Sequence, residues 1–157
     1  MQKTSPCLWF DRQAKEAANF YVSVFRNSRI KNLARYGDGA PMPKGTVLTV
    51  SFELDGQEFV ALNGGPHFTF SPAISFVVNC ASQQEVDDFW QKLSAHPDRE
   101  QCGWLQDKYG VSWQIVPTAL PQMLGDPDPA RAQRVMTAML AMKKLDIAAL
   151  QRAYDGL

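Results

Sequence analysis

The sequence predicts an α+β fold in which two modules of strands around one helix are followed by C-terminal helices. Two apolar runs each lead into a helical pattern, and the patterns superimpose with a constant shift of 69 positions, aligning Ala17 with Val86 and Val24 with Leu93. Short β-prone runs separated by turn residues follow each helical pattern. The end of the chain returns to helical periodicity. Each module has one apolar sheet face to cover, so we expect the two modules to be paired.

The first module is expected to hold a strand over 7–10, a helix and three further strands. Apolar residues recur at helical spacing from Ala14 onward, and Asp11 suits the helix N-terminus because its carboxylate can accept free backbone N–H groups. The strand-like runs cover about 30–36, 46–54 and 57–62. Asp55-Gly56 joins the last two runs and favours a tight hairpin turn. The Gly- and Pro-rich connection 37–45 is predicted to be a surface loop.

The second module repeats this order less completely and leads into the helical tail. An apolar run at 73–78 precedes a helix that begins after Ser82, where Glu85 three residues later completes a capping box. Strands are predicted over 101–106 and 111–116. Tail helices are expected to start at Asp128 and Asp146, and the last of them to end at Gly156.

Bulk composition excludes several classes of function. The 157 residues suit a single domain, and 16 Lys+Arg balance 16 Asp+Glu without blocks of like charge. We therefore expect no nucleic-acid partner and no membrane partner. The start of the chain lacks the apolar core of a signal peptide, and three distant cysteines fit reduced thiols, so a cytoplasmic location is expected.

Three motifs resemble one known family. The stretches PCLWFDRQAKEAANFYVSVF, ALNGGPHFTFSPAISF and QCGWLQDKYGVSWQIVP are similar to the PhnB-like family, often labelled demethylubiquinone methyltransferase-like, and the tail stretch MKKLDIAALQRAY fits it too. This family belongs to the vicinal oxygen chelate superfamily, with the glyoxalases and bleomycin-resistance proteins. The resemblance implies paired βαβββ modules in one PhnB-like domain over 1–157: module one at about 1–65, module two at about 70–117 and a helical tail at about 118–157. It also implies a homodimer.

The resemblance further implies where a metal would be bound. In glyoxalase-like relatives, the first and last strands of each module point ligands into the cup of the sheet. Transferred to this chain, those positions are Pro6, Ala61, Ser75 and Gln114, of which only Gln114 is a plausible ligand. Divalent metals need several converging donor atoms, so we predict that the usual metal site is lacking, and we assign no cofactor.

The same positions define a candidate pocket. Because strand side chains alternate, residues two positions from the transferred ones are predicted to share their face. The alternative is that this set simply fills a core. It comprises Leu8, Phe10, Asn63, Val77, Ser112 and Val116.

Three further residues are candidates for the pocket or its rim, and one glycine pair is not. His67 lies in NGGPHFTF with no acidic residue near it in sequence, so a turn or rim hydrogen bond is its expected role. Cys102 lacks an evident base partner, which favours packing over catalysis. Trp104 alternates with smaller residues and is either a stacking surface or a core residue. Gly64-Gly65 precedes no helix, which argues against a phosphate or nucleotide site.

Together these patterns predict a protein that binds a small organic molecule. The predicted binding set is Leu8, Phe10, Asn63, His67, Ser75, Cys102, Trp104 and Gln114. The alternative is an enzyme that acts on a quinone-like or other aromatic molecule. No residue is assigned a catalytic role.

Overall fold

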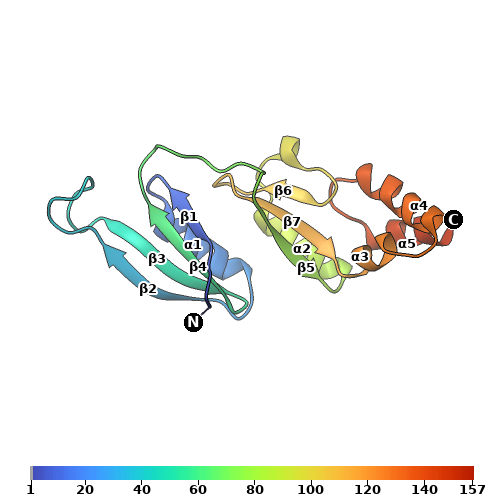
Figure 1. Ribbon diagram of the computed structural model, residues 1–157, viewed down its shortest axis with the longest axis horizontal. Helices are drawn as coiled ribbons and strands as arrows, with labels where there is room; N and C mark the ends of the chain where they lie inside the picture. The colour runs from blue at the N-terminus through green and yellow to red at the C-terminus, as the bar shows by residue number, and fades with distance from the viewer. Residues whose placement is uncertain (1) are drawn as a thin grey trace. The chain divides into compact units, whose positions relative to one another are not determined.

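Figure 1 shows the fold in a computed structural model, which describes residues 2–157. The chain forms two compact units, the first extending through Phe70 and the second starting at Ser71. Each unit contains one small sheet, called sheet A in the first unit and sheet B in the second, with a helix packed against it. The predicted α+β class is therefore confirmed. Within residues 2–157, no helix is long and apolar enough to cross a bilayer.

The first unit follows the predicted element order. It contains β1 (Cys7–Phe10), α1 (Ala14–Val24), β2 (Arg29–Arg35), β3 (Val47–Leu54) and β4 (Gln57–Asn63). Sheet A has the order β1-β4-β3-β2, with β1 parallel to β4 and the other pairs antiparallel. Asp55 and Gly56 both have positive φ, at 47° and 83°, as the predicted tight hairpin requires. The predicted limits of these four strands agree with the structure to within one residue, whereas in the second module the runs 73–78 and 101–106 correspond to strands at Ser75–Cys80 and Trp104–Gln106.

The second unit repeats the arrangement with one strand fewer. It contains β5 (Ser75–Cys80), α2 (Gln83–Leu93), the 3-10 turn η1 (Pro97–Arg99), β6 (Trp104–Gln106) and β7 (Ser112–Pro117). Sheet B has the order β5-β7-β6, and β5 is parallel to β7 as β1 is to β4. The side chain of Ser82 accepts a hydrogen bond from the Glu85 amide at 3.2 Å, so the predicted helix cap is present.

The core of the first unit lies between α1 and sheet A. Ala17 and Tyr21 are fully buried on the helix, and the Tyr21 ring stacks on Phe52 of β3 with 6.3 Å between ring centroids. Leu8 and Phe10 are buried as well, whereas their neighbours on β1 are more exposed. Because successive side chains of a strand point to opposite faces, Leu8 and Phe10 lie on the helix side of sheet A.

The predicted facing of Leu8, Phe10 and Asn63 is therefore wrong. Asn63 is 3% exposed, and its Oδ1 accepts a hydrogen bond at 2.8 Å from the Ala14 amide at the start of α1. Asn63 thus satisfies a free helix N–H that the side chain of Gln13 leaves unpaired. All three predicted pocket residues belong to the helix-facing core.

The error arises because the loop between β1 and α1 is one residue longer than the loop between β5 and α2. Helices α1 and α2 begin and end 69 positions apart, as predicted, but three residues separate β1 from α1 and only two separate β5 from α2. A register transferred from the helices therefore slips by one position in the strands. A slip of one residue moves every strand side chain to the other face, which explains why the transferred positions fail in sheet A.

The C-terminal residues form three helices: α3 (Ala119–Leu124), α4 (Pro129–Leu140) and α5 (Ile147–Asp155). Asp128 and Asp146 cap α4 and α5 by accepting backbone hydrogen bonds, and Gly156 ends α5 at φ 77°, as predicted. The short helix α3 was not predicted. The helices share a buried cluster of Leu120, Met123, Val135, Leu145 and Leu150.

The C-terminal segment is fastened to the turn that leads into β6. The amides of Cys102 and Gly103 donate to the carbonyls of Met142 and Lys143 at 2.7 and 2.8 Å. A Cβ atom added to Gly103 would lie 3.0 Å from Leu145 Cδ1, so glycine permits this close approach. The position of the turn before β6 thus depends on the C-terminal segment.

Candidate binding groove on sheet B

One face of sheet B carries α2, and the opposite face, called here the open face, carries a mixed set of side chains. Val78, Leu105 and Ile115 are buried on the helix side. On the open face Val77 is 53% exposed. Strand register places the open-face residues in two cross-strand rows, a polar row of Ser75, Ser112 and Gln106 and a second row of Val77, Gln114 and Trp104.

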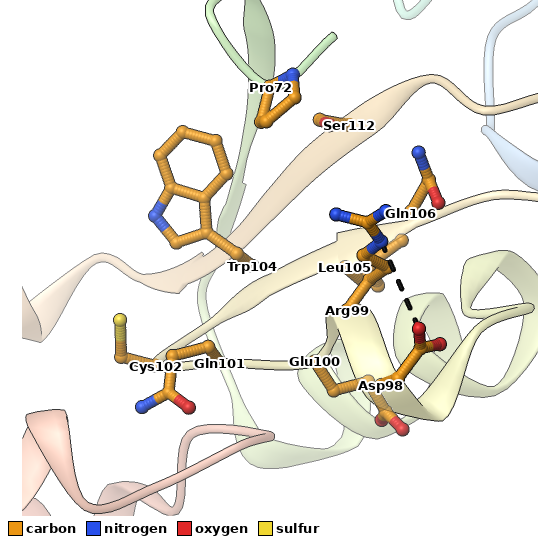
Figure 2. A pocket seen from close by; sticks show the side chains of 10 residues that line it. All are labelled: Pro72, Asp98, Arg99, Glu100, Gln101, Cys102, Trp104, Leu105, Gln106 and Ser112. Carbon is orange, nitrogen blue, oxygen red and sulfur yellow. Dashed lines mark ion pairs between the residues drawn. The ribbon is translucent and has the colours of Figure 1, made fainter.

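A groove of about 420 Å³ lies at the β6 end of the polar row. The indole of Trp104 stands on one side of it, below Pro72, and the Arg99 guanidinium stands on the other side near Gln106, as Figure 2 shows. The complete lining is Pro72, Asp98, Arg99, Glu100, Gln101, Cys102, Trp104, Leu105, Gln106 and Ser112. All of these residues belong to the second unit. Aromatic and apolar surface beside convergent polar groups is the usual composition of a small-molecule site.

Trp104 differs from the other tryptophans in its hydrogen bonding. Trp9, Trp90 and Trp113 each donate the indole N–H to an acceptor within the chain, at 2.6 to 2.9 Å. The indole N–H of Trp104 has no such partner among residues 2–157. Partly exposed at the groove, Trp104 offers both a ring face and a hydrogen-bond donor to a bound molecule.

The predicted residues Ser75 and Gln114 meet on the open face. Gln114 Nε2 donates to Ser75 Oγ at 2.9 Å, across the parallel pair of β5 and β7. This bond orients the side-chain amide of Gln114, so that its nitrogen faces Ser75 and its carbonyl oxygen points away from Ser75. The structure therefore brings Ser75, Gln114 and Trp104 to one face, and Cys102 to the lining of the adjoining groove.

The remaining predicted site residues lie elsewhere. His67 is exposed in the first unit, and Leu8, Phe10 and Asn63 lie in the core of that unit. Sequence reasoning did not identify Arg99 or Gln106 as groove residues. Gln106 is two positions from Trp104 on one strand, so alternation could have found it. Arg99 lies in a 3-10 turn, for which the polar sequence HPDREQ gave no signal.

The three charged side chains that line the groove differ in the interactions that they make within the chain. The Arg99 Nε atom lies 4.0 Å from Asp98 Oδ2, too far for a hydrogen bond, and both side chains are largely exposed at 61% and 81%. The Glu100 carboxylate accepts the indole N–H of Trp90 at 2.6 Å. Arg99 and Asp98 thus make fewer interactions within the chain than Glu100 does.

The stretch NGGPHFTF has a packing role. A Cβ atom on Gly64 would lie 2.3 Å from the Trp9 ring, whose indole N–H donates to the Gly65 carbonyl at 2.9 Å. Phe68 packs edge-on against the same ring with 4.9 Å between centroids. Gly64 therefore makes room for Trp9.

The chain does not fit the two groups that the family resemblance suggests, a nucleotide-like methyl donor and a metal ion. A nucleotide-like methyl donor is commonly held by a glycine-rich turn between a strand and a helix, but Gly64 is covered by Trp9 and the next element is β5. At the transferred metal positions, Ala61 is buried on the helix side and Ser75 is bonded to Gln114. Residues 2–157 contain no group of three or more His, Cys, Asp or Glu side chains placed to hold a metal ion.

The comparisons place the chain in a family. The family model described as 3-demethylubiquinone-9 3-methyltransferase matches residues 2–116. The chain belongs to this family. A PhnB protein from Bacillus cereus is 39% identical, with 74% of this chain and 100% of that chain covered and a TM-score of 0.64. The predicted PhnB-like relationship is therefore confirmed, and no curated protein matches the chain.

One more distant solved structure shares the fold. Protein PA1353 from Pseudomonas aeruginosa is 17% identical, with 74% of this chain and 98% of that chain covered and a TM-score of 0.57. A glyoxylase/bleomycin resistance protein/dioxygenase domain from Frankia sp. EAN1pec is 14% identical, with 74% and 91% covered and a TM-score of 0.48. The family match ends at residue 116, so α3, α4 and α5 lie beyond it.

Proposed function

We propose that this protein binds a small, flat organic molecule in the groove on sheet B. The observation that carries the proposal is Trp104, whose ring borders the groove and whose indole N–H lacks a partner among residues 2–157. Ser112, Gln106 and the Ser75–Gln114 pair supply hydrogen-bonding groups on the same face. A stacked ring with a few directed polar contacts gives affinity together with orientation.

Titration calorimetry with 2-naphthamide tests this proposal, because the probe is flat, uncharged and able to hydrogen-bond. We expect saturable binding to the unaltered protein and at least a tenfold loss in Trp104→Ala. Trp9→Phe is the matched control, because Trp9 lies in the first unit and its indole N–H already donates to the Gly65 carbonyl. Equal affinity in Trp104→Ala, with both variants folded by circular dichroism, would refute the groove as the binding site.

The second candidate function is an enzyme that acts on a quinone-like or other aromatic molecule. The description of the matched family favours it. Titration with S-adenosylmethionine checks the methyl-transfer form of this candidate. From the packing of Gly64 we expect no binding at micromolar concentrations, and micromolar binding would establish the enzyme as the better candidate.

We further propose that the protein is a homodimer. Support comes from apolar side chains on β5 and the segment before it, where Ile74 is 73% exposed and Val77 is 53% exposed. Sedimentation velocity is expected to give twice the 17.6 kDa chain mass. A single species at the chain mass would contradict the dimer.

A further inference from the structure

The floor of the groove holds a hydroxyl group that has no hydrogen-bond partner among the described residues. Ser112 is 4% exposed and lines the groove, and its hydroxyl has no hydrogen-bond partner among residues 2–157. The cross-strand neighbours of Ser112 are Ser75 and Gln106. The Ser112 hydroxyl is not among the fully enclosed side-chain atoms that lack a partner, so it opens onto the groove and can bond a polar atom of a ligand there.

Arg99 provides the one cationic side chain among the residues that line the groove. The turn η1 begins with Pro97 and is held against β6, since the Ala95 amide donates to the Gln106 carbonyl at 3.0 Å. Figure 2 shows the guanidinium on the side of Gln106 and Ser112. A guanidinium presents several N–H donors in a plane, which suits the two oxygens of a carboxylate.

Two carboxylates, those of Asp98 and Glu100, also line the groove, and their charges bear on which ligands it can bind. Glu100 holds the Trp90 indole at 2.6 Å, and Figure 2 shows its carboxylate on the opposite side of the backbone from Trp104. Asp98 is 81% exposed and lies 4.0 Å from Arg99 Nε, and Arg99 is 61% exposed, so solvent screens both charges and the more exposed Asp98 most. Of the three charged side chains, that of Arg99 is the one that Figure 2 shows on the side of Gln106 and Ser112.

We propose that the ligand is a flat aromatic carboxylate. Its ring stacks on Trp104, and its carboxylate accepts hydrogen bonds from the Arg99 guanidinium and the Ser112 hydroxyl. This inference rests on the proposed function and adds the charge of the ligand to it.

A set of three probes with one ring system tests the inference: 2-naphthoate, 2-naphthamide and the cationic 2-naphthylmethylamine, each titrated calorimetrically. We expect 2-naphthoate to bind at least tenfold more tightly than 2-naphthamide and to lose this advantage in Arg99→Gln. The Arg99→Lys variant should keep part of the preference, because it keeps the charge without the planar fork. Ser112→Ala should weaken 2-naphthoate binding severalfold. Added salt should reduce the preference.

The outcomes separate the two proposals. If 2-naphthamide binds in a Trp104-dependent way but 2-naphthoate binds no better, or Arg99→Gln leaves the affinities unchanged, the carboxylate inference fails and the proposed function stands. Tighter binding of 2-naphthylmethylamine would show that Asp98 and Glu100 dominate and would also overturn the inference. If none of the probes binds, or binding ignores Trp104, the proposed function and the inference fail together.

Discussion

The substitution Gly64→Ala tests whether the glycine pair of NGGPHFTF is there for packing. A Cβ atom at residue 64 would lie 2.3 to 2.4 Å from three atoms of the Trp9 ring, far inside van der Waals contact, so the indole must move. Its displacement breaks the 2.9 Å bond to the Gly65 carbonyl, worth about 1 kcal/mol, and the edge contact with Phe68, worth about 1 kcal/mol. We expect these losses to lower the free energy of unfolding by about 2 kcal/mol. Alanine also lowers the conformational entropy of the unfolded chain, which favours folding, but the residual strain around the added methyl group offsets that gain.

Guanidinium unfolding followed by far-ultraviolet circular dichroism measures this change, and near-ultraviolet dichroism reports the Trp9 environment. The matched control is Gly37→Ala, because a Cβ atom at Gly37 meets no atom within 4 Å and its φ is not positive. The control should stay within about 0.5 kcal/mol of the unaltered protein. Equal stability of the two variants would refute the packing role of Gly64.

Three further predictions concern buried or paired groups. Asn63→Ala should lower the free energy of unfolding by about 2 kcal/mol in chemical denaturation, because an amide of α1 loses its partner; a loss below about 0.5 kcal/mol would contradict this role. Burial raises the pKa of Cys80 to about 12, so a thiol reagent at pH 8 should modify exposed Cys7 and leave Cys80 unreacted in native protein, as intact-mass analysis would show. The hydrogen bond from the Tyr154 hydroxyl lowers the pKa of Asp126. The unaltered protein should therefore melt at a higher temperature than Tyr154→Phe at pH values above the ordinary carboxyl pKa, and this difference should disappear as the pH falls through the lowered pKa of Asp126. A difference in melting temperature that does not change with pH would refute the link.

Local rules predicted the elements of this fold well. The helix caps at Ser82, Asp128 and Asp146 and the Asp55-Gly56 hairpin are short-range signals, and each is present in the structure. Helix α3 was missed because it is one short run that contains Pro121 and has no side-chain cap. Signals of this kind depend on residues three or four apart, which a single sequence displays directly.

The site was predicted only in part because strand facing depends on exact register. Ser75, Gln114 and Trp104 lie on the open face of sheet B, whereas Leu8 and Phe10 lie on the helix side of sheet A. One extra residue between β1 and α1 produces the difference, and nothing in the composition of that loop reveals its effect. Arg99 reaches the groove through tertiary packing of η1 and not through any periodic pattern.

The indole N–H resonance of Trp104 gives the most direct test of the proposed groove. In a two-dimensional ¹H–¹⁵N spectrum the side chains of the 4 tryptophans give separate signals, and those of Trp9, Trp90 and Trp113 report N–H groups already bonded within the chain. On addition of 2-naphthoate, we predict saturable shifts of the Trp104 indole signal and of the backbone amides of Arg99 and Ser112. Shifts confined to the Trp9 indole and its neighbours, with an unchanged Trp104 signal, would contradict the account.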